Sequence, residues 1–389
     1  MSKVRVGLIG SGFIAAVHMR AFRRVYGVAV DVRTVISLDD DVADFARRFA
    51  IPNSGRDWRS ILTDPEIDVV DICTPPDLHA EMVVACMRAG KHVICEKPFT
   101  GYFGRPGDAT PVGTKVAKSV MYQRVMEEME ATCAAIRATD RLFCYAECWV
   151  YAPAVAKAAE IVRASGDKLL FIKAENGHSG SHAAHAANWS LSGGGALIRQ
   201  GCHPLTGALY LKGVEAAARG ERITVTDVTC DVGLVTPTLA PQQRTYLQAH
   251  PVDVEDWGVL SVTFSDATKA TVFASDMVIG GLRNLLEAYT TGGALYANIA
   301  PNTHVVAYLT DESRLGDVYI NEKLDRKTGW QFVCVDEEGI RGFFGEMQDF
   351  MECVSLGRQP LCGLDLAYDT IKIHYAGYWA AEEGRRISL

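Results

Sequence analysis

Short apolar runs alternate with segments of helical spacing over the first 165 residues. The run 4–9 (VRVGLI) ends in glycines, and the segment after it carries Val17, Ala21 and Val25 on one helical face. The pattern predicts strands 4–9, 32–37, 68–73, 92–95 and 143–146, and helices 15–24, 42–49, 79–89, 119–139 and 153–165. Strands that alternate with helices pair in parallel through right-handed crossovers, so we predict an α/β domain with a doubly wound parallel sheet.

The pattern changes after residue 169, where longer runs with β-rich composition follow one another. They predict strands 169–176, 223–232, 257–264, 269–278, 285–291 and 304–310. Because few helical segments separate them, we predict a second α/β domain with a large, open, mainly antiparallel or mixed sheet. Helical spacing returns at 345–356 and 366–383. We therefore predict a first domain of residues 1–150 and a second of residues 151–389, whose last helices pack back on the first.

Composition and charge narrow the classes of function. Hydrophobic residues make up 48% of the 389 residues and charged residues 22%, as in ordinary globular proteins. The net charge of −8 at pH 7 and the absence of a basic run argue against a nucleic-acid partner. The apolar N-terminal stretch is shorter than the ~20 residues that span a bilayer, so we expect no membrane partner. The eleven cysteines are scattered and form no CxxC motif, which favours reduced thiols, a cytoplasmic location and no metal site.

Residues 10–15 (GSGFIA) follow the first predicted strand and fit the pattern G-x-G-x-x-A. In that pattern Gly10 permits the tight turn, Gly12 lets the backbone approach a pyrophosphate, and Ala15 lets the helix pack closely on the strand. Phe13 and Ile14, between Gly12 and Ala15, are further candidates for cofactor contact, and the N-terminus of the following helix then faces the phosphates. The segment predicts a Rossmann domain that binds a dinucleotide.

The end of the second predicted strand bears on the choice of cofactor. An acidic residue normally grips the adenosine ribose of NAD there, but Ser37 holds that position and Asp39 lies two residues further on. No arginine lies beside them in the sequence to meet a 2′-phosphate. The pattern favours NAD without excluding NADP, although acidic residues at 39–41 are also typical of a solvated helix N-terminus.

Four segments carry a resemblance to the glucose-fructose oxidoreductase, inositol dehydrogenase and MocA (Gfo/Idh/MocA) family of oxidoreductases. They are GSGFIAAVHMRAF at 10–22, DVVDICTPPDLHAEMVVACMRAGKHVICEKPF at 68–99, SGGGALIRQGCHPL at 192–205 and GRQPLCGLDLAYDTIKIHYAGYWAAEEGR at 357–385. The EKP tripeptide is the most specific of these signals. The resemblance covers nearly the whole chain and implies homo-dimers or tetramers.

The resemblance implies roles for the tripeptide Glu96-Lys97-Pro98. The segment would lie beside the nicotinamide, and Lys97 would bind the substrate hydroxyl that is oxidised. A partly buried ammonium there can donate to a developing alkoxide and relay a proton. Pro98 would fix the turn that aims Lys97, through a cis bond if one is present. The matching pocket-lining residues beside the nicotinamide are Thr74, Pro75, Leu78 and His79, although a capping or packing role is equally open for His79.

The glycine-rich segment departs from the family pattern at one position. The family's dehydrogenases usually carry an Asp there and a His four residues on; this chain has Arg199 and His203. Arginine is a permanently charged, planar donor that suits a carboxylate, phosphate or sulfonate. Arg199 therefore either binds an anionic group of the substrate or pairs with a carboxylate of the protein. His203 is the candidate general base.

The remaining candidates for substrate contact lie near the start of the second domain. Residues 175–185 (ENGHSGSHAAH) follow its first strand, and the glycines and serines favour a loop in which His178 or His182 contacts substrate over a helical metal site. Tyr151 and Trp189 offer aromatic surface for a sugar ring, although a core position is the commoner use of each.

Together these features predict an NAD-dependent dehydrogenase that acts on a small sugar, with an anionic sugar favoured. His203 removes a hydroxyl proton, Lys97 stabilises the alkoxide and a hydride passes to the nicotinamide. An alternative is an NAD-dependent glycoside hydrolase, which oxidises an acidic or sulfonated sugar glycoside transiently and recycles its cofactor. A third class, a non-catalytic NAD sensor, would need neither Lys97 nor His203.

Overall fold

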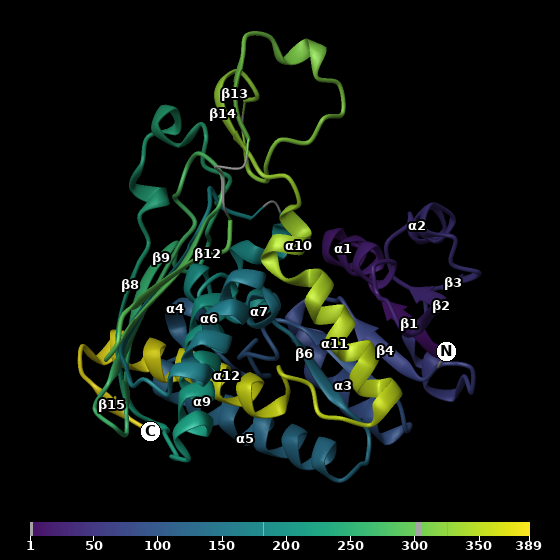
Figure 1. The fold of residues 1–389 in the computed structure, drawn as a ribbon, viewed down its shortest axis with the longest axis horizontal. Coiled ribbons are helices and arrows are strands. Elements are labelled where there is room, and N and C mark those ends of the chain that lie inside the picture. Colours follow the sequence, from purple (N-terminus) through teal and green to yellow (C-terminus); the bar gives the residue numbers. More distant parts are fainter. Residues whose placement is uncertain (1–2, 182, 301–304, 325) are drawn as a thin grey trace.

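A parallel sheet of six strands forms the N-terminal part of the molecule (Figure 1). The computed structural model describes residues 3–181, 183–300, 305–324 and 326–389. In the order β3-β2-β1-β4-β5-β6, the strands are β1 (Lys3–Ile9), β2 (Ala29–Ile36), β3 (Asn53–Gly55), β4 (Val69–Ile72), β5 (His92–Glu96) and β6 (Phe143–Ala146). All neighbouring pairs are parallel. The predicted doubly wound sheet is confirmed, and the chain changes direction across it between β1 and β4, where such folds bind ligands.

Helices cover this sheet, and α1 also packs against the C-terminal part of the chain. They are α1 (Phe13–Phe22), α2 (Val42–Phe49), α3 (His79–Arg88), α4 (Val112–Lys115) and α5 (Lys118–Arg137), with 3₁₀ turns η1 (Trp58–Thr63), η2 (Pro76–Leu78) and η3 (Cys148–Tyr151). Helix α3 packs beside α5, and α1 packs against α11 (Phe343–Leu356) from the C-terminal part. Strands β4 and β6 are buried along their whole length, because helices or other segments cover both faces of the sheet.

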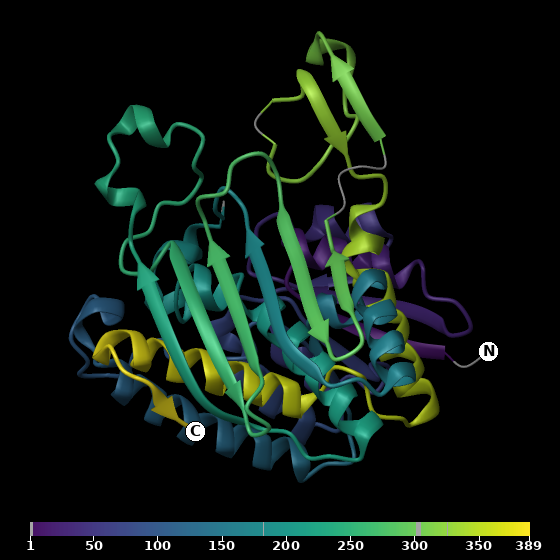
Figure 2. The same cartoon turned by 60° about the vertical axis from the view of Figure 1, so that its left-hand side comes forward.

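The second sheet has seven strands and is mixed, as the sequence predicted. In spatial order they are β12 (Ala294–Asn298), β11 (Arg283–Thr290), β7 (Leu169–Gly177), β10 (Lys269–Ser275), β9 (Trp257–Phe264), β8 (Val225–Gly233) and β15 (Ile387–Ser388). Only β7 and β10 pair in parallel among these described strands. Buried and half-buried residues alternate strictly along β9, because one face of the sheet is covered by helices (Figure 2).

The last predicted strand, 304–310, does not join the large sheet. Residue 304 lies outside the described residues. Within the described part of the chain, β13 (Val305–Leu309) pairs with β14 (Gly329–Val333) alone, in a two-stranded sheet that projects from the body (Figure 1). Val305, Val306 and Tyr308 are exposed on it. The composition of the run predicted a strand, but strand composition does not determine which strand will be the partner.

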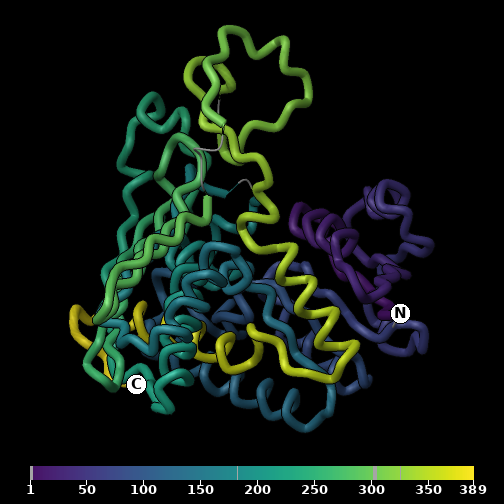
Figure 3. The backbone as a smooth tube through the Cα atoms, viewed as in Figure 1, coloured from purple at the N-terminus to yellow at the C-terminus, as the bar shows by residue number. Residues whose placement is uncertain are grey.

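Further helices lie in the C-terminal part of the chain, and some of them contact the first part. They are α6 (Pro153–Ser165), α7 (Trp189–Ser192), α8 (Ala196–Arg199), α9 (Cys202–Arg219), α10 (Glu337–Arg341), α11 and α12 (Leu364–Glu383), with 3₁₀ turns η4 (Ala184–Ala187), η5 (Thr236–Thr238), η6 (Pro241–Arg244) and η7 (Glu312–Arg314). Helix α12 packs on β8 and on α5, so the chain returns to its first part (Figure 3). In the described part of the chain, no helix is long and apolar enough to cross a membrane.

A buried carboxylate, Glu255, fixes the segment that precedes α9. Its Oε2 accepts from the backbone N–H of Gly195 at 2.9 Å, and its Oε1 accepts from that of Leu197 at 2.9 Å. The same Oε1 accepts from the Tyr378 hydroxyl at 2.7 Å, which joins the segment to α12. A Cβ at position 195 would lie 1.9 Å from the backbone oxygen of Glu255, so only glycine fits there.

We expect Glu255→Ala to lower the free energy of unfolding by about 3–5 kcal/mol, because it leaves three buried donors without an acceptor. Urea unfolding followed by fluorescence measures this. Glu160→Ala removes an exposed carboxylate and should change the free energy of unfolding by less than about 0.5 kcal/mol. Equal effects of the two variants would contradict the assignment.

Candidate functional site

The turn between β1 and α1 has the geometry that a diphosphate needs. Gly10 has φ +111°, and a Cβ there would lie 2.4 Å from the backbone oxygen of Cys73, so the tight turn requires glycine. A Cβ at Gly12 would meet nothing within 4 Å. The N-terminus of α1 faces this open side, where its free N–H groups can bind phosphate oxygens. The turn therefore fits a dinucleotide.

A carboxylate joins the end of β2 to this turn. The hydroxyls of Ser37 and Ser11 both donate to Oδ2 of Asp39, at 2.9 and 3.0 Å. Asp39 is thus held at the glycine turn, after the second strand, where folds of this kind commonly carry the acid that binds the adenosine ribose of NAD. Arg56 also reaches this loop, donating to the backbone oxygen of Leu38 and to Asp40. Arg56 was not among the predicted neighbours, because it comes from beyond β3.

Two exposed apolar side chains flank the glycine turn. Phe13 is 69% exposed at the first residue of α1, and Leu38 is 72% exposed after β2. Ile14, also predicted at the cofactor site, is partly buried against the core. Exposed apolar side chains of this size offer a nucleotide base a surface to cover.

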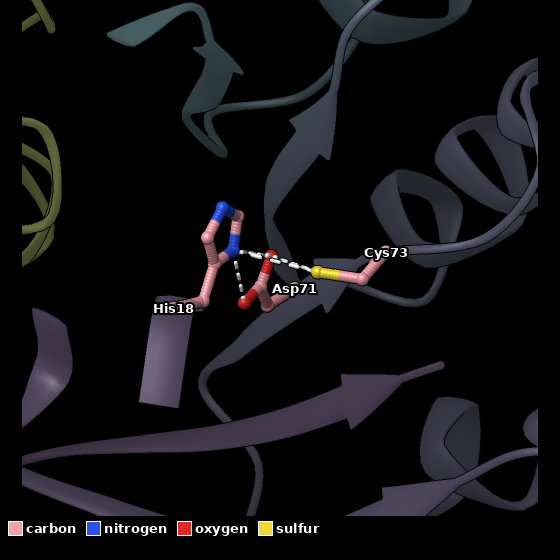
Figure 4. Close-up of side chains that lie close together, drawn as sticks. All are labelled: His18, Asp71 and Cys73. Carbon is pink, nitrogen blue, oxygen red and sulfur yellow. Dashed lines mark hydrogen bonds and ion pairs between the residues drawn. The ribbon is translucent and has the colours of Figure 1, made fainter. Parts of the chain in front are cut away.

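A series of buried side chains links α1 to β4 and β5, and Figure 4 shows three of them, His18, Asp71 and Cys73. Nδ1 of His18, on α1, lies 2.9 Å from Oδ2 of Asp71 and 3.4 Å from Sγ of Cys73. Nε2 of the same ring lies 3.1 Å from Oε1 of Glu96. The other oxygen of Glu96 accepts from the backbone N–H of Lys97 at 2.9 Å. The series thus connects α1, β4 and β5 to the lysine of the EKP tripeptide.

The buried charged groups shift one another's pKa values. Burial by itself lowers the pKa of His18, but the charge and hydrogen bond of Asp71 raise that pKa well above its ordinary value. Burial raises the pKa of Glu96, and the hydrogen bond and charge of His18 bring it below its ordinary value. His18 is therefore an imidazolium that donates from both ring nitrogens to carboxylates.

The loops after β4 and β5 are tied together beside Lys97. The Lys97–Pro98 peptide bond is cis. One ring nitrogen of His79 lies 2.9 Å from the backbone oxygen of Pro98, and the other lies 2.9 Å from that of Thr74. His79 thus holds the two loops in place as a buried side chain. Thr74, with the nearby Pro75 and Leu78, follows β4 at the carboxyl edge of the sheet, the edge at which such folds bind ligands.

The amine of Lys97 meets the second part of the chain. Its Nζ donates to the backbone oxygen of Arg199 at 2.9 Å. Arg199 is the last residue of the short helix α8, and His203 is the second residue of α9, which begins three residues later. Lys97 thus contacts a residue four positions before His203, and its positive charge contributes to lowering the pKa of His203.

A buried carboxylate that sequence reasoning missed contacts His203. Oε1 of Glu147 lies 2.5 Å from Nδ1 of the His203 ring, and Glu147 is fully buried. The ring of His203 is also stacked on Trp149, with centroids 6.1 Å apart and an interplanar angle of 15°. Glu147 directly follows β6, and that position at a strand end is the signal that could have drawn attention to it.

Arg199 forms an ion pair with the protein. Its Nη2 contacts Oδ2 of Asp276, while Gln200 contacts the other oxygen of that carboxylate. Asp276 follows β10 and is only 3% exposed. Arg199 and Asp276 line a cavity of about 90 Å³, together with Ser181, His250 and several alanines. Two roles were predicted for Arg199, binding of a substrate anion or an ion pair with the protein. The structure shows the ion pair, with Asp276.

The other predicted substrate contacts are placed differently. Tyr151 is buried, and its hydroxyl donates to Asp349 at 2.8 Å, so its side chain belongs to the core. Trp189 is also buried and packs against Tyr378 in α12. For both, the core position considered from the sequence replaces the expected contact with a sugar ring. His182 lies outside the described residues.

His178 lies in the loop after β7, as predicted. Its Nδ1 accepts from the backbone N–H of Gly180 at 3.0 Å. Burial and the positive charges of Lys323 and Arg199 lower its pKa to about 2. His178 is therefore neutral across the working range of pH and can serve as a hydrogen-bonding group.

Among the residues that the structure describes, two groups of side chains have the composition of metal ligands, namely His18 with Asp71 and Cys73, and His203 with Glu147 and Cys148. In each group the histidine nitrogen is in direct hydrogen-bond contact with a carboxylate oxygen. These contacts already use the atoms that would bind an ion.

Two family models match the chain. Residues 4–137 match the model described as an oxidoreductase family with an NAD-binding Rossmann fold. Residues 164–296 match the GFO/IDH/MocA C-terminal domain. Together the two matches cover more than half of the chain. The predicted NAD cofactor is confirmed by the first match.

Relatives with known activities are similar over different lengths. Levoglucosan dehydrogenase of Pseudarthrobacter phenanthrenivorans is 29% identical over 335 residues, which is 80% of this chain and 78% of that protein. Myo-inositol 2-dehydrogenase of Thermotoga maritima is 30% identical over 102 residues, 25% of this chain and 29% of that one. The first similarity therefore extends across both sheets.

Solved structures share the fold over the whole chain. GenD2 from gentamicin A biosynthesis, in complex with NAD, has a TM-score of 0.79 at 21% identity and covers 100% of this chain and 97% of its own. Levoglucosan dehydrogenase with NADH and levoglucosan has a TM-score of 0.75 at 23% identity, covering 100% and 99%. These likenesses establish the arrangement of the two sheets.

We expect Asp39→Asn to raise the Kd of NAD roughly 10-fold or more, because a hydrogen bond to a charged acceptor contributes about 1.5–3 kcal/mol. Titration of the protein with NAD, followed by quenching of its fluorescence, measures this. Asp41→Asn makes the same change at an exposed position two residues on and should leave the Kd unchanged. An unchanged Kd in Asp39→Asn would remove Asp39 from the cofactor site.

Proposed function

Because the chain belongs to the GFO/IDH/MocA family of NAD-dependent oxidoreductases, we propose that it oxidises one hydroxyl of a sugar or polyol by hydride transfer to NAD. The observation that carries this proposal is the placement of Lys97. The buried series through Glu96 holds its backbone, and its amine lies beside Arg199, close enough to lower the pKa of His203. A cation and a neutral histidine then act on the same hydroxyl.

The reaction converts a secondary alcohol to a ketone. NAD, when bound, accepts the hydride from the carbon. Nε2 of His203 takes the hydroxyl proton, since its Nδ1 is bound to Glu147. The amine of Lys97 donates a hydrogen bond to the oxygen as negative charge develops there, which stabilises the transition state. The loops tied by His79 keep this amine at the carboxyl edge of the sheet.

We propose a neutral sugar or polyol as the substrate, in place of the anionic sugar favoured by the sequence. The charge of Arg199 is balanced by Asp276 within the same cavity. A guanidinium and a carboxylate side by side can donate to one hydroxyl and accept from the next, which suits a vicinal diol. An anionic group would have to displace Asp276 or lie against it.

The test of the proposed reaction mixes the protein and NAD with levoglucosan, inositols, glucose, glucuronate and aryl glycosides. We expect NADH in proportion to product with a neutral sugar or polyol. Lys97→Met should lower kcat/KM roughly 10²–10³-fold, the usual loss when a donor to a developing oxyanion is removed, with the Kd of NAD unchanged. Lys115→Met, an exposed lysine, is the control and should match the native protein.

Two outcomes would contradict the proposed reaction. Released aglycone without net NADH would instead support the glycoside hydrolase that the sequence left as an alternative. Full activity of Lys97→Met would remove the lysine from the reaction.

The proposed charge preference has its own test in a matched pair of sugars, glucose and glucuronate. We expect the native protein to favour the neutral sugar in kcat/KM. Asp276→Asn frees the guanidinium of Arg199, so it should shift the ratio toward the acid by roughly 10-fold, the usual gain from one charge-assisted contact. A native protein that already favours the acid would contradict the neutral substrate.

A further inference from the structure

Glu147 is placed to act on His203 and has little structural use of its own. Its backbone directly follows β6 and precedes the turn η3, and its Oε1 accepts weakly from the N–H of Trp149 at 3.3 Å. The main partner of Oε1 is Nδ1 of His203. Its Oε2 is buried, with no hydrogen-bond partner among the described residues.

A buried carboxylate with one unpaired oxygen destabilises the folded protein, so orienting the His203 ring does not by itself explain Glu147. Removing a charge from water costs several kcal/mol, and a buried oxygen without a donor adds to this cost. Stacking on Trp149 and a neutral hydrogen bond would hold His203 with less loss of stability. The negative charge itself therefore calls for an explanation in terms of the reaction.

The contact fixes the protonation of the His203 ring. Because a carboxylate only accepts, the nitrogen that faces Glu147 must carry the hydrogen, and Nε2 is left with the lone pair. Trp149 limits rotation of the ring, so Nε2 keeps one direction. The ring is thereby prepared to take a proton at a single atom.

The charges around His203 oppose one another. Burial lowers its pKa most, the charge and hydrogen bond of Glu147 raise it, and the positive charges of Lys97 and Arg341 lower it. The net pKa lies below the ordinary value, so the free ring is neutral near pH 7. Once the ring takes a proton, its positive charge lies against Glu147, while the charges of Lys97 and Arg341 disfavour it.

We propose that Glu147 is the positioning residue for proton transfer by His203, a role that rests on the proposed function. As the C–H bond gives up its hydride to NAD, the O–H bond of the substrate breaks and its proton forms a bond to Nε2. Nδ1 keeps its own hydrogen, and the imidazolium is stabilised by the Glu147 carboxylate. The negative charge of Glu147 thus offsets the repulsion that Lys97 and Arg341 exert on the protonated ring.

The kinetic test compares Glu147→Gln, His203→Ala and the double variant. We expect Glu147→Gln to lower kcat/KM roughly 10²–10⁴-fold, as loss of the carboxylate from a histidine–carboxylate pair does elsewhere. Since Glu147 raises the pKa of His203, the acid limb of the profile of kcat/KM against pH should move to lower pH. The double variant should be no slower than His203→Ala alone, because both residues act through one ring.

A matched control is Asp349→Asn, which also converts a buried carboxylate to an amide, at a site bonded to Tyr151 in the core. It should leave the acid limb where it is. An unmoved acid limb in Glu147→Gln, or losses that multiply in the double variant, would overturn the proposal.

A second measurement needs no substrate, so it separates this proposal from the proposed function. ¹⁵N NMR of histidine-labelled protein reports which ring nitrogen carries the hydrogen, and the signals of His203 are those absent from His203→Ala. We expect the Nδ1–H form in the native protein at pH 7 and its loss in Glu147→Gln. A native ring with its hydrogen on Nε2 would overturn the proposal even if sugars are oxidised.

Discussion

The imidazolium of His18 joins the carboxylates of Asp71 and Glu96 in the interior of the first sheet, and the geometry of the site depends on this contact. Each buried charge would be costly alone, but three together satisfy one another. The free oxygen of Glu96 then holds the backbone of Lys97. One helix and two strand ends are thus fixed relative to each other, and the glycine turn and the lysine take their positions from them.

The cavity beside Arg199 is lined by residues of the second part of the chain, between Ser181 and Asp276. Glu255 fixes the segment before α9, and the carbonyl of Arg199 receives the amine of Lys97. The charge of Arg199 is balanced locally, since its guanidinium pairs with Asp276. A cavity in which a guanidinium and a carboxylate balance each other favours ligands that donate and accept hydrogen bonds over ligands that carry net charge.

Local patterns predicted the parts of the site that lie within one strand and its turn. The glycine turn and the EKP tripeptide each follow a strand, so their neighbours along the chain determine their geometry. The partners of Arg199 and His203 could not be predicted in this way. Asp276 lies 77 residues from Arg199, and Glu147 lies 56 residues from His203. Spacing along the chain carries no information about such contacts.

The sequence by itself determined the two kinds of sheet and the dinucleotide turn, because the periods of burial and the turn residues act over a few residues. Only the tertiary structure decided that Tyr151 and Trp189 belong to the core, that Asp39 reaches the turn and that Arg199 is paired. Aromatic and charged side chains are compatible with either a core or a site. Packing between distant segments selects one of these environments.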